Sequence, residues 1–460
     1  MSKPTTSHNG LFLSTPLRIF LLAFALSVVF FVGRLTALGL LSGPPGDRDE
    51  VYFDIIAINL AAGNGFSGET TSAVKDVYSP LDPGILDAMS WTEQVGGNDR
   101  TTFRPPLYPF LLSVTYRVFG HSFAAMRVMN CLLLALGSAI LFTALGSATG
   151  AGVLALIIVL SFDPHLFAFS RFGLSEALAF PLTAAAIAIP FFTHRGRSAQ
   201  ALALGGIFGL LLLARPVFLF WMPGACMAIA LGSWRPSDLS TPLRRVILML
   251  ACVFVFYLPW GIRNSALLSG LHPFGSQGGI AFGEVYYGRS DVSHWDGNWT
   301  AENADNFHRS LPAGGSGLER EHRAMDLGMK VFRDWVESHR SDIPRLWALR
   351  AYSLWWSDAM PYQRALALIA ALSFLAFARK EPRFWTSVFY LACHTLAICF
   401  AYNARGDDGL YGRFLTSVYP IFFLSIALAA DAVQRKARPR EKTNVFEKTN
   451  PGTSTIESAK

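Results

Sequence analysis

Two adjacent carboxylates, Asp49 and Glu50, follow the first long apolar run of the chain, which covers residues 17–41. A carboxylate held beside a lipid surface can accept a proton from a hydroxyl group that acts as a nucleophile. The same acidic pair also suits the first turn of a helix, where negative charge is favoured. A general base and an ordinary helix start are therefore both open interpretations at this point.

A cationic motif supplies the second candidate. Arg104 stands directly before Pro105 and Pro106, which mark the start of a second predicted helix, and Tyr108 lies in the first turn of that helix. A cation beside free backbone N–H groups suits an anion such as a lipid phosphate. The alternative is an exposed arginine that only extends toward lipid headgroups and contributes little to stability.

A third group of charges lies in a turn predicted between two apolar runs. Asp163 begins this turn, and Arg171 and Glu176 end it. Charges this close to lipid are costly unless they are paired or face water. They form either a network that ties two helices together or a second acidic site that faces Asp49.

Three arginines stand at the ends of apolar runs: Arg215, Arg263 and Arg413. All three are predicted on the outer side of the membrane, against the usual enrichment of basic residues inside. We therefore expect them to bind an anionic substrate.

The sequence predicts no metal site. Glu284, His294 and Asp296 are close in sequence, but their spacing is not typical of a metal centre. A divalent metal stays open as a cofactor.

Composition indicates that lipid is the main solvent of this chain. Of 460 residues, 52% are hydrophobic and 15% are charged, whereas soluble domains carry about 25% charged residues. The net charge of +7 does not indicate nucleic acid, because the basic residues gather at the ends of apolar runs and in the C-terminal tail, as membrane orientation requires.

The apolar runs predict an all-α integral membrane protein. A helix needs about 20 apolar residues to cross a bilayer, and about ten segments qualify. They cover residues 17–41, 122–146, 150–165, 172–192, 199–214, 216–232, 245–262, 363–378, 384–402 and 411–431.

Basic loops predict that both termini are cytoplasmic. The basic residues concerned are Arg195 and Arg197; Arg235, Arg244 and Arg245; Arg379, Lys380 and Arg383; and those of the tail after residue 432. The predicted parts are a cytoplasmic N-terminus (1–16), a transmembrane region (17–262) with an external loop (43–121) that holds two amphipathic surface helices, a second external region (263–361), C-terminal transmembrane helices (362–431) and a basic, disordered cytoplasmic tail (432–460).

The motifs, taken in order, resemble a known family. They are Asp49-Glu50, Gly63-Asn64-Gly65-Phe66, Arg104-Pro105-Pro106-Leu107-Tyr108-Pro109, Ser175-Glu176, Arg215-Pro216, Pro259-Trp260-Gly261-Ile262-Arg263 and Arg413-Phe414. In this order and over roughly residues 17–430 they resemble the bacterial branch of the dolichyl-phosphate-mannose-protein mannosyltransferase superfamily, which includes the lipid A aminoarabinose transferases.

The resemblance implies a GT-C fold in a bacterial inner membrane and inverting sugar transfer from a polyprenyl-phosphate donor on the external face. It implies that Asp49 is the base and that Glu176 matches an acidic position of a later turn. The acceptor is a lipid, a glycan or a protein. Phe103 stands where the aminoarabinose transferases have an acidic residue, which argues against that activity. The alternatives are a transporter or flippase, and a non-catalytic membrane partner.

Overall fold

The chain folds into helices throughout its described part. A computed structural model describes residues 15–45, 48–81, 100–145, 150–192, 198–233, 240–289, 295, 300–312, 314–357, 360–377, 382–401 and 413–437. None of these residues lies in a β-strand. The predicted all-α class is therefore confirmed.

Four helices are long and apolar enough to cross a membrane, or up to six if each of two bent pairs forms one span. The four are α1 (Thr15–Ala37), α6 (Phe123–Leu145), α12 (Ser240–Leu267) and α19 (Tyr419–Ala437), the last counted from Phe414. One bent pair joins α7 (Gly150–Phe162) to α8 (Pro164–Arg171) at 53°. The other joins the segment of α16 (Ile343–Tyr352) to α17 (Pro361–Phe377). The chain is a multi-pass membrane protein.

The remaining predicted spans also contain apolar helices, of 12 to 20 residues. They are α9 (Glu176–Phe192), α10 (Ser198–Ala214), the turn Pro216–Trp221 with α11 (Met222–Ser233), and α18 (Pro382–Ala401). Each of the ten predicted segments thus contains a helix, although only four to six spans among the described residues are long and apolar enough to cross a membrane.

Burial separates outer helices from inner ones. Within the most apolar 18-residue stretch of each helix, 17% of the residues are buried in α1 and 22% in α12, compared with 78% in α19. Since lipid solvates apolar side chains, the exposed leucines and phenylalanines of α1 and α12 face lipid. The buried core is built around α6, α9, α10 and α19.

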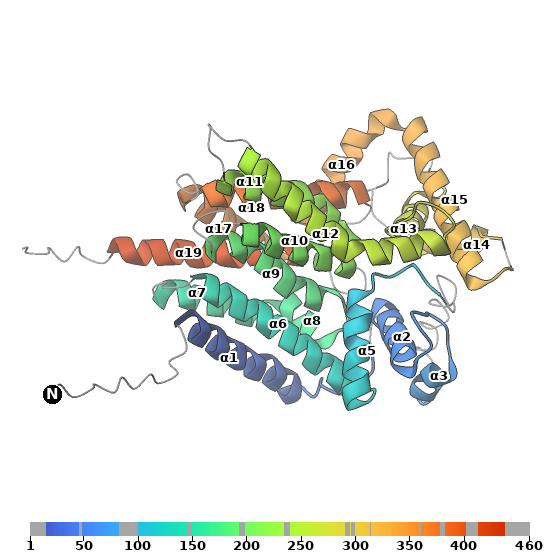
Figure 1. Ribbon diagram of the computed structural model, residues 1–460, viewed down its shortest axis with the longest axis horizontal. Helices are drawn as coiled ribbons and strands as arrows, with labels where there is room; N and C mark the ends of the chain where they lie inside the picture. The colour runs from blue at the N-terminus through green and yellow to red at the C-terminus, as the bar shows by residue number, and fades with distance from the viewer. Residues whose placement is uncertain are drawn as a thin grey trace, which may run out of the picture.

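The two ends of the bundle differ. In Figure 1, α1 begins and α19 ends at the same end, on the left, where Arg435 and Lys436 close α19. At the opposite end, here called the distal end, α1 is followed by α2 (Arg48–Ala62), α3 (Ser72–Tyr78) and α5 (Leu107–Phe119).

Helix α2 is a core helix of the distal end. Its residues 51–59 are all buried, because Val51 and Ile55 pack against α3, α5 and α6 while Tyr52 and Ile56 pack against α13 and α15. The prediction that α2 lies on the membrane surface is therefore wrong. Helix α5 does keep an exposed apolar face, with Phe110, Val114 and Val118.

A second helical unit covers the distal end. It consists of α13 (Gln277–Tyr286), α14 (Ala301–Ser310), α15 (Gly317–Ser338) and α16. Helical patterns in the sequence, around residues 319–338 and 344–356, predict α15 and α16, but no such pattern predicts α13 or α14. Helix α15 begins with a capping box, in which Ser316 accepts a hydrogen bond from the Glu319 amide and the Glu319 side chain bonds the Ser316 amide.

Glycines let α13 and α15 approach closely. A β-carbon at Gly328 of α15 would lie 1.9 Å from the carbonyl oxygen of Gly279 in α13, and one at Gly279 would lie 2.7 Å from the Met325 carbonyl oxygen. Neither position leaves room for a methyl group. The backbone contact therefore fixes where α15 stands relative to α13.

This contact gives a stability prediction. Gly328→Ala forces the two helices apart and should lower unfolding free energy by about 1–3 kcal/mol, despite the gain of about 1 kcal/mol from helix propensity. Gly278→Ala is the matched control, because a β-carbon there meets nothing within 4 Å. Thermal unfolding in detergent should show a lower midpoint for Gly328→Ala only. Equal midpoints for the two variants would contradict the close crossing.

Candidate active site

An ion pair joins the first turn of α2 to the segment before α5. A guanidinium nitrogen of Arg104 donates to the Asp49 carboxylate. The Asp49 side chain is 21% exposed and that of Arg104 is 8% exposed. Two of the residues predicted to carry chemistry therefore meet directly at the distal end, and the acidic one is open to solvent.

Three aromatic rings surround the Arg104 guanidinium. Its central carbon lies 4.6 Å from the ring centre of Phe103, 5.3 Å from Phe53 and 5.5 Å from Tyr52. Its buried Nε atom has no hydrogen-bond partner among the described residues. The alternative interpretation, an exposed Arg104, is therefore wrong.

Glu50 points away from Asp49 and into the protein. It is fully buried, and its Oε1 atom accepts a hydrogen bond of 2.8 Å from the amide of Gly173. Gly173 lies in the turn between α8 and α9. A β-carbon at Gly173 would lie 3.0 Å from the Glu50 side chain. Glu50 thus fixes the start of α2 against the following membrane helices.

Glu176 and Arg215 form a second buried pair, at 2.6 Å between Oε1 and Nη1. Glu176 starts α9, and Arg215 follows α10. The Arg215 guanidinium also lies 5.8 Å from the ring centre of Phe414. This geometry matches the interpretation of a network that ties helices together.

Three further predicted substrate-binding residues make contacts within the protein. Asp163 is buried and accepts from the amide of Leu166, so it caps α8. The predicted turn after Asp163 is in fact mostly this short helix. Tyr108 is fully buried and donates to Asn130. The Arg171 guanidinium lies over the Phe172 ring.

Arg263 supports the segment that carries Arg104. Its Nη1 atom donates to the Thr101 carbonyl at 3.1 Å, and its guanidinium lies 4.4 Å from the ring centre of Trp260. The structure therefore places the Arg263 side chain, from α12, against the carbonyl of Thr101, three residues before Arg104 on the loop. The Arg413 side chain lies outside the described residues.

Sequence reasoning missed a buried carboxylate in α2. Asp54 accepts hydrogen bonds from the hydroxyls of Tyr78 and Tyr116, and its Oδ2 atom lies 3.1 Å from Nε2 of His121. Burial first, and then the Asp54 charge, raises the pKa of both tyrosines above the usual range. One signal was available, since Asp54 is a charge within the otherwise apolar stretch 51–58.

Two other buried charges were missed. Arg127 in α6 donates to the carbonyls of Pro44 and Arg171, which joins the loop before α2 to the end of α8. Glu321 in α15 accepts from Thr101, Thr102 and Ser276. Their partners are distant in sequence, so spacing alone could not find them.

Among the described residues, no group of three His, Cys, Asp or Glu side chains could hold a metal ion. Glu284 instead pairs with Nε2 of His308 at 2.9 Å. His294 and Asp296 lie outside the described residues. A divalent metal as cofactor therefore stays open.

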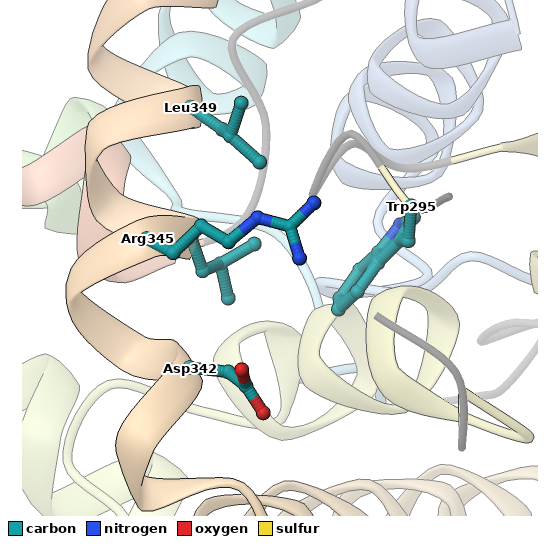
Figure 2. Close-up of a pocket in the computed structure, with 5 residues that line it drawn as sticks. Trp295, Asp342, Arg345 and Leu349 are labelled. Atoms are coloured by element: carbon teal, nitrogen blue, oxygen red, sulfur yellow. The ribbon is translucent and has the colours of Figure 1, made fainter. Parts of the chain in front are cut away.

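A small pocket lies apart from this site, in the unit formed by α13 to α16. Figure 2 shows Arg345 extending from α16 toward Trp295, with Asp342 below it and Leu349 above. None of the residues predicted to carry chemistry lines this pocket.

The comparison with protein families matches part of the chain. Residues 103–260 fit the family described as dolichyl-phosphate-mannose-protein mannosyltransferase. This segment is similar to that family. The resemblance predicted from the motifs is thus confirmed, and the matched family segment contains Arg104, Tyr108, Asp163, Arg171, Glu176 and Arg215. No curated protein sequence matches the chain.

Solved structures show only distant likeness. The Archaeoglobus fulgidus oligosaccharyltransferase in its apo form aligns with 92% of this chain at 11% identity and a TM-score of 0.48, and the chain spans about half of its length (51%). ArnT from Cupriavidus metallidurans aligns with 92% of the chain at 13% identity in its apo state and bound to undecaprenyl phosphate, with TM-scores of 0.36 and 0.35 and with 78% and 79% of ArnT covered.

Proposed function

We propose that this protein is an inverting glycosyltransferase that moves a sugar from a polyprenyl-phosphate donor to an acceptor hydroxyl at the distal end. The family name supplies the class of donor. The observation that carries the proposal is the contact between Asp49 and Arg104, which joins a proton acceptor to a phosphate-binding cation where the chain leaves the membrane.

Asp49 acts as the general base in this proposal. The acceptor oxygen attacks C1 of the sugar from the face opposite the phosphate, and the C1–O bond to phosphate breaks. The hydroxyl proton passes to the Asp49 carboxylate. Glu50 cannot meet an acceptor in the same way, because it is fully buried and bonded to Gly173. Glu50 therefore orients α2, and Glu176 stabilises α9 through Arg215.

Arg104 binds the donor phosphate. A phosphodiester carries about one negative charge, and the phosphate monoester that leaves approaches two. A cation fixed before the reaction stabilises this increase in charge without reorganising. The guanidinium of Arg104, whose side chain is 8% exposed, supplies N–H donors for a phosphate oxygen. Arg263 contributes by holding the same loop.

The alternative, a transporter or flippase, places its binding site near the middle of the membrane. The predicted charged residues meet instead at the distal end, around the start of α2 and the 101–104 segment. This distribution favours an enzyme that works at the membrane surface.

The first functional prediction concerns the base. Asp49→Asn keeps the side-chain shape but removes the basic carboxylate, so turnover of polyprenyl-phosphate mannose by purified protein should fall about 10²–10⁴-fold. Donor affinity should be kept. Glu50→Gln retains an oxygen for the Gly173 amide and should lose less than about tenfold. Asp76→Asn, at an exposed position of α3, is the control and should be unchanged.

A fully active Asp49→Asn enzyme would exclude Asp49 as the base. An inactive but folded Glu50→Gln protein, together with an active Asp49→Asn protein, would show that Glu50 and not Asp49 is the base.

The second functional prediction concerns phosphate. Arg104→Lys keeps the charge but loses the fork of N–H donors, so the Kd for polyprenyl phosphate should rise about tenfold, the loss of one charge-assisted hydrogen bond. Arg100→Lys changes an exposed arginine four residues earlier and should bind normally. Equal affinity of the two variants would mean that Arg104 has only a structural role.

The third functional prediction concerns orientation. If the distal end is external, a membrane-impermeant maleimide should label Asp326→Cys, an exposed position of α15, in intact cells. Arg244→Cys, exposed near the start of α12, should react only after permeabilisation. A background in which the five natural cysteines are replaced removes their signal. The reverse labelling pattern would place the site on the cytoplasmic side.

A further inference from the structure

One buried carboxylate connects the α13–α15 unit to the segment that carries Arg104. Glu321 of α15 is 1% exposed. Its Oε1 atom accepts from the Thr102 amide at 2.8 Å, from the Thr102 hydroxyl, and from the Ser276 hydroxyl at 2.7 Å. Its Oε2 atom accepts from the Thr101 hydroxyl at 2.9 Å. All four donors point at one carboxylate, and three of them belong to Thr101 and Thr102, just before Phe103 and Arg104.

The hydroxyl network has a defined direction. A threonine hydroxyl has one proton, and Thr101 gives it to Glu321. The Tyr52 hydroxyl, 3.1 Å from the Thr101 hydroxyl oxygen, must therefore donate to Thr101. The Tyr52 ring is also one of the three that surround the Arg104 guanidinium. Glu321 thus orients the Tyr52 ring beside Arg104 as well as the backbone of the segment that carries Arg104.

The backbone of the same segment is held from two other sides. Arg263 donates to the Thr101 carbonyl. Gly275 lies against the Thr102 carbonyl, where a β-carbon would stand 2.2 Å from the oxygen. Residues 101 and 102 are thus enclosed by α12, the loop that follows it, and α15.

Such a carboxylate is costly to bury. Burial raises the pKa of Glu321 above its usual value, while its hydrogen bonds from Ser276, Thr102 and Thr101 act in the opposite direction. Because folding raises the pKa of Glu321, the free energy of unfolding falls as the pH rises from the ordinary pKa of a glutamate to the raised pKa of Glu321. A buried charge that costs stability in this way is weak support for a purely stabilising role.

We infer that Glu321 is a positioning residue for Arg104: it fixes Thr101 and Thr102 so that the guanidinium stands beside Asp49. The role rests on the proposed function of Arg104 as the phosphate ligand. Glu321 touches no substrate and acts through the 101–104 backbone and the Tyr52 ring.

Glu321→Gln tests this role. Glutamine has the same size but turns an NH₂ group toward hydroxyl and amide donors. Hydrogen exchange at the amides of residues 102–104 should become faster, and the Kd for polyprenyl phosphate should rise about tenfold. Glu337→Gln, exposed on the same helix, is the matched control and should change neither quantity. Unchanged exchange at residues 102–104 would overturn the positioning role whatever the affinity.

A double-mutant cycle separates positioning from general stability. If Glu321 acts through Arg104, adding Glu321→Gln to Arg104→Lys should raise the Kd less than twofold further. Effects that multiply in full would mean that the two residues act independently and would overturn the inference. A wild-type protein that binds no polyprenyl phosphate would contradict the proposed function, and the exchange measurement would then decide the positioning role alone.

Discussion

The distal end of this protein depends on the rule that a charge removed from water needs a partner. Glu50, Glu176, Glu321 and Arg104 are all buried there. Each partner comes from another part of the chain: Glu50 bonds the amide of Gly173, 123 residues away, and Glu321 bonds that of Thr102, 219 residues away. Satisfying these charges therefore determines how the loops between the membrane helices fold.

Helix α2 is the element on which these contacts converge. One side packs on α3, α5 and α6, and another packs on α13 and α15. Its first turn presents Asp49 to Arg104 and Glu50 to Gly173. Because α2 is enclosed by both distal units, a shift in either unit would move the acidic pair. The glycine contact between α13 and α15 and the Glu321 bonds limit such a shift.

The length of the apolar runs was enough to predict the helices of the membrane region, because lipid requires a long apolar segment from each. The motif around Arg104 was also identified, although neither its ion pair with Asp49 nor its burial was predicted. Glu321 and Asp54 could not be predicted, since their roles come from partners that meet only in the folded chain. Helix α2 was misplaced on the membrane surface because its apolar face was interpreted as facing lipid, when protein covers both sides. Helices α13 and α14 were missed in a stretch rich in Gly, Asp, His and Trp.

The differences in exposure among the acidic residues narrow the choice of a base. Glu50 is fully buried, the Glu176 side chain is 3% exposed, and that of Asp49 is 21% exposed. An acceptor hydroxyl can reach a carboxylate only where protein leaves room. The two buried carboxylates are bonded to an amide and a guanidinium group and so hold helices in place. Their role is therefore structural. Asp49 alone of the three combines a cationic neighbour with access from outside, and Arg104 is fixed by rings and backbone before any substrate arrives. Preorganisation of this kind is what stabilises a developing charge without further cost at the moment of reaction.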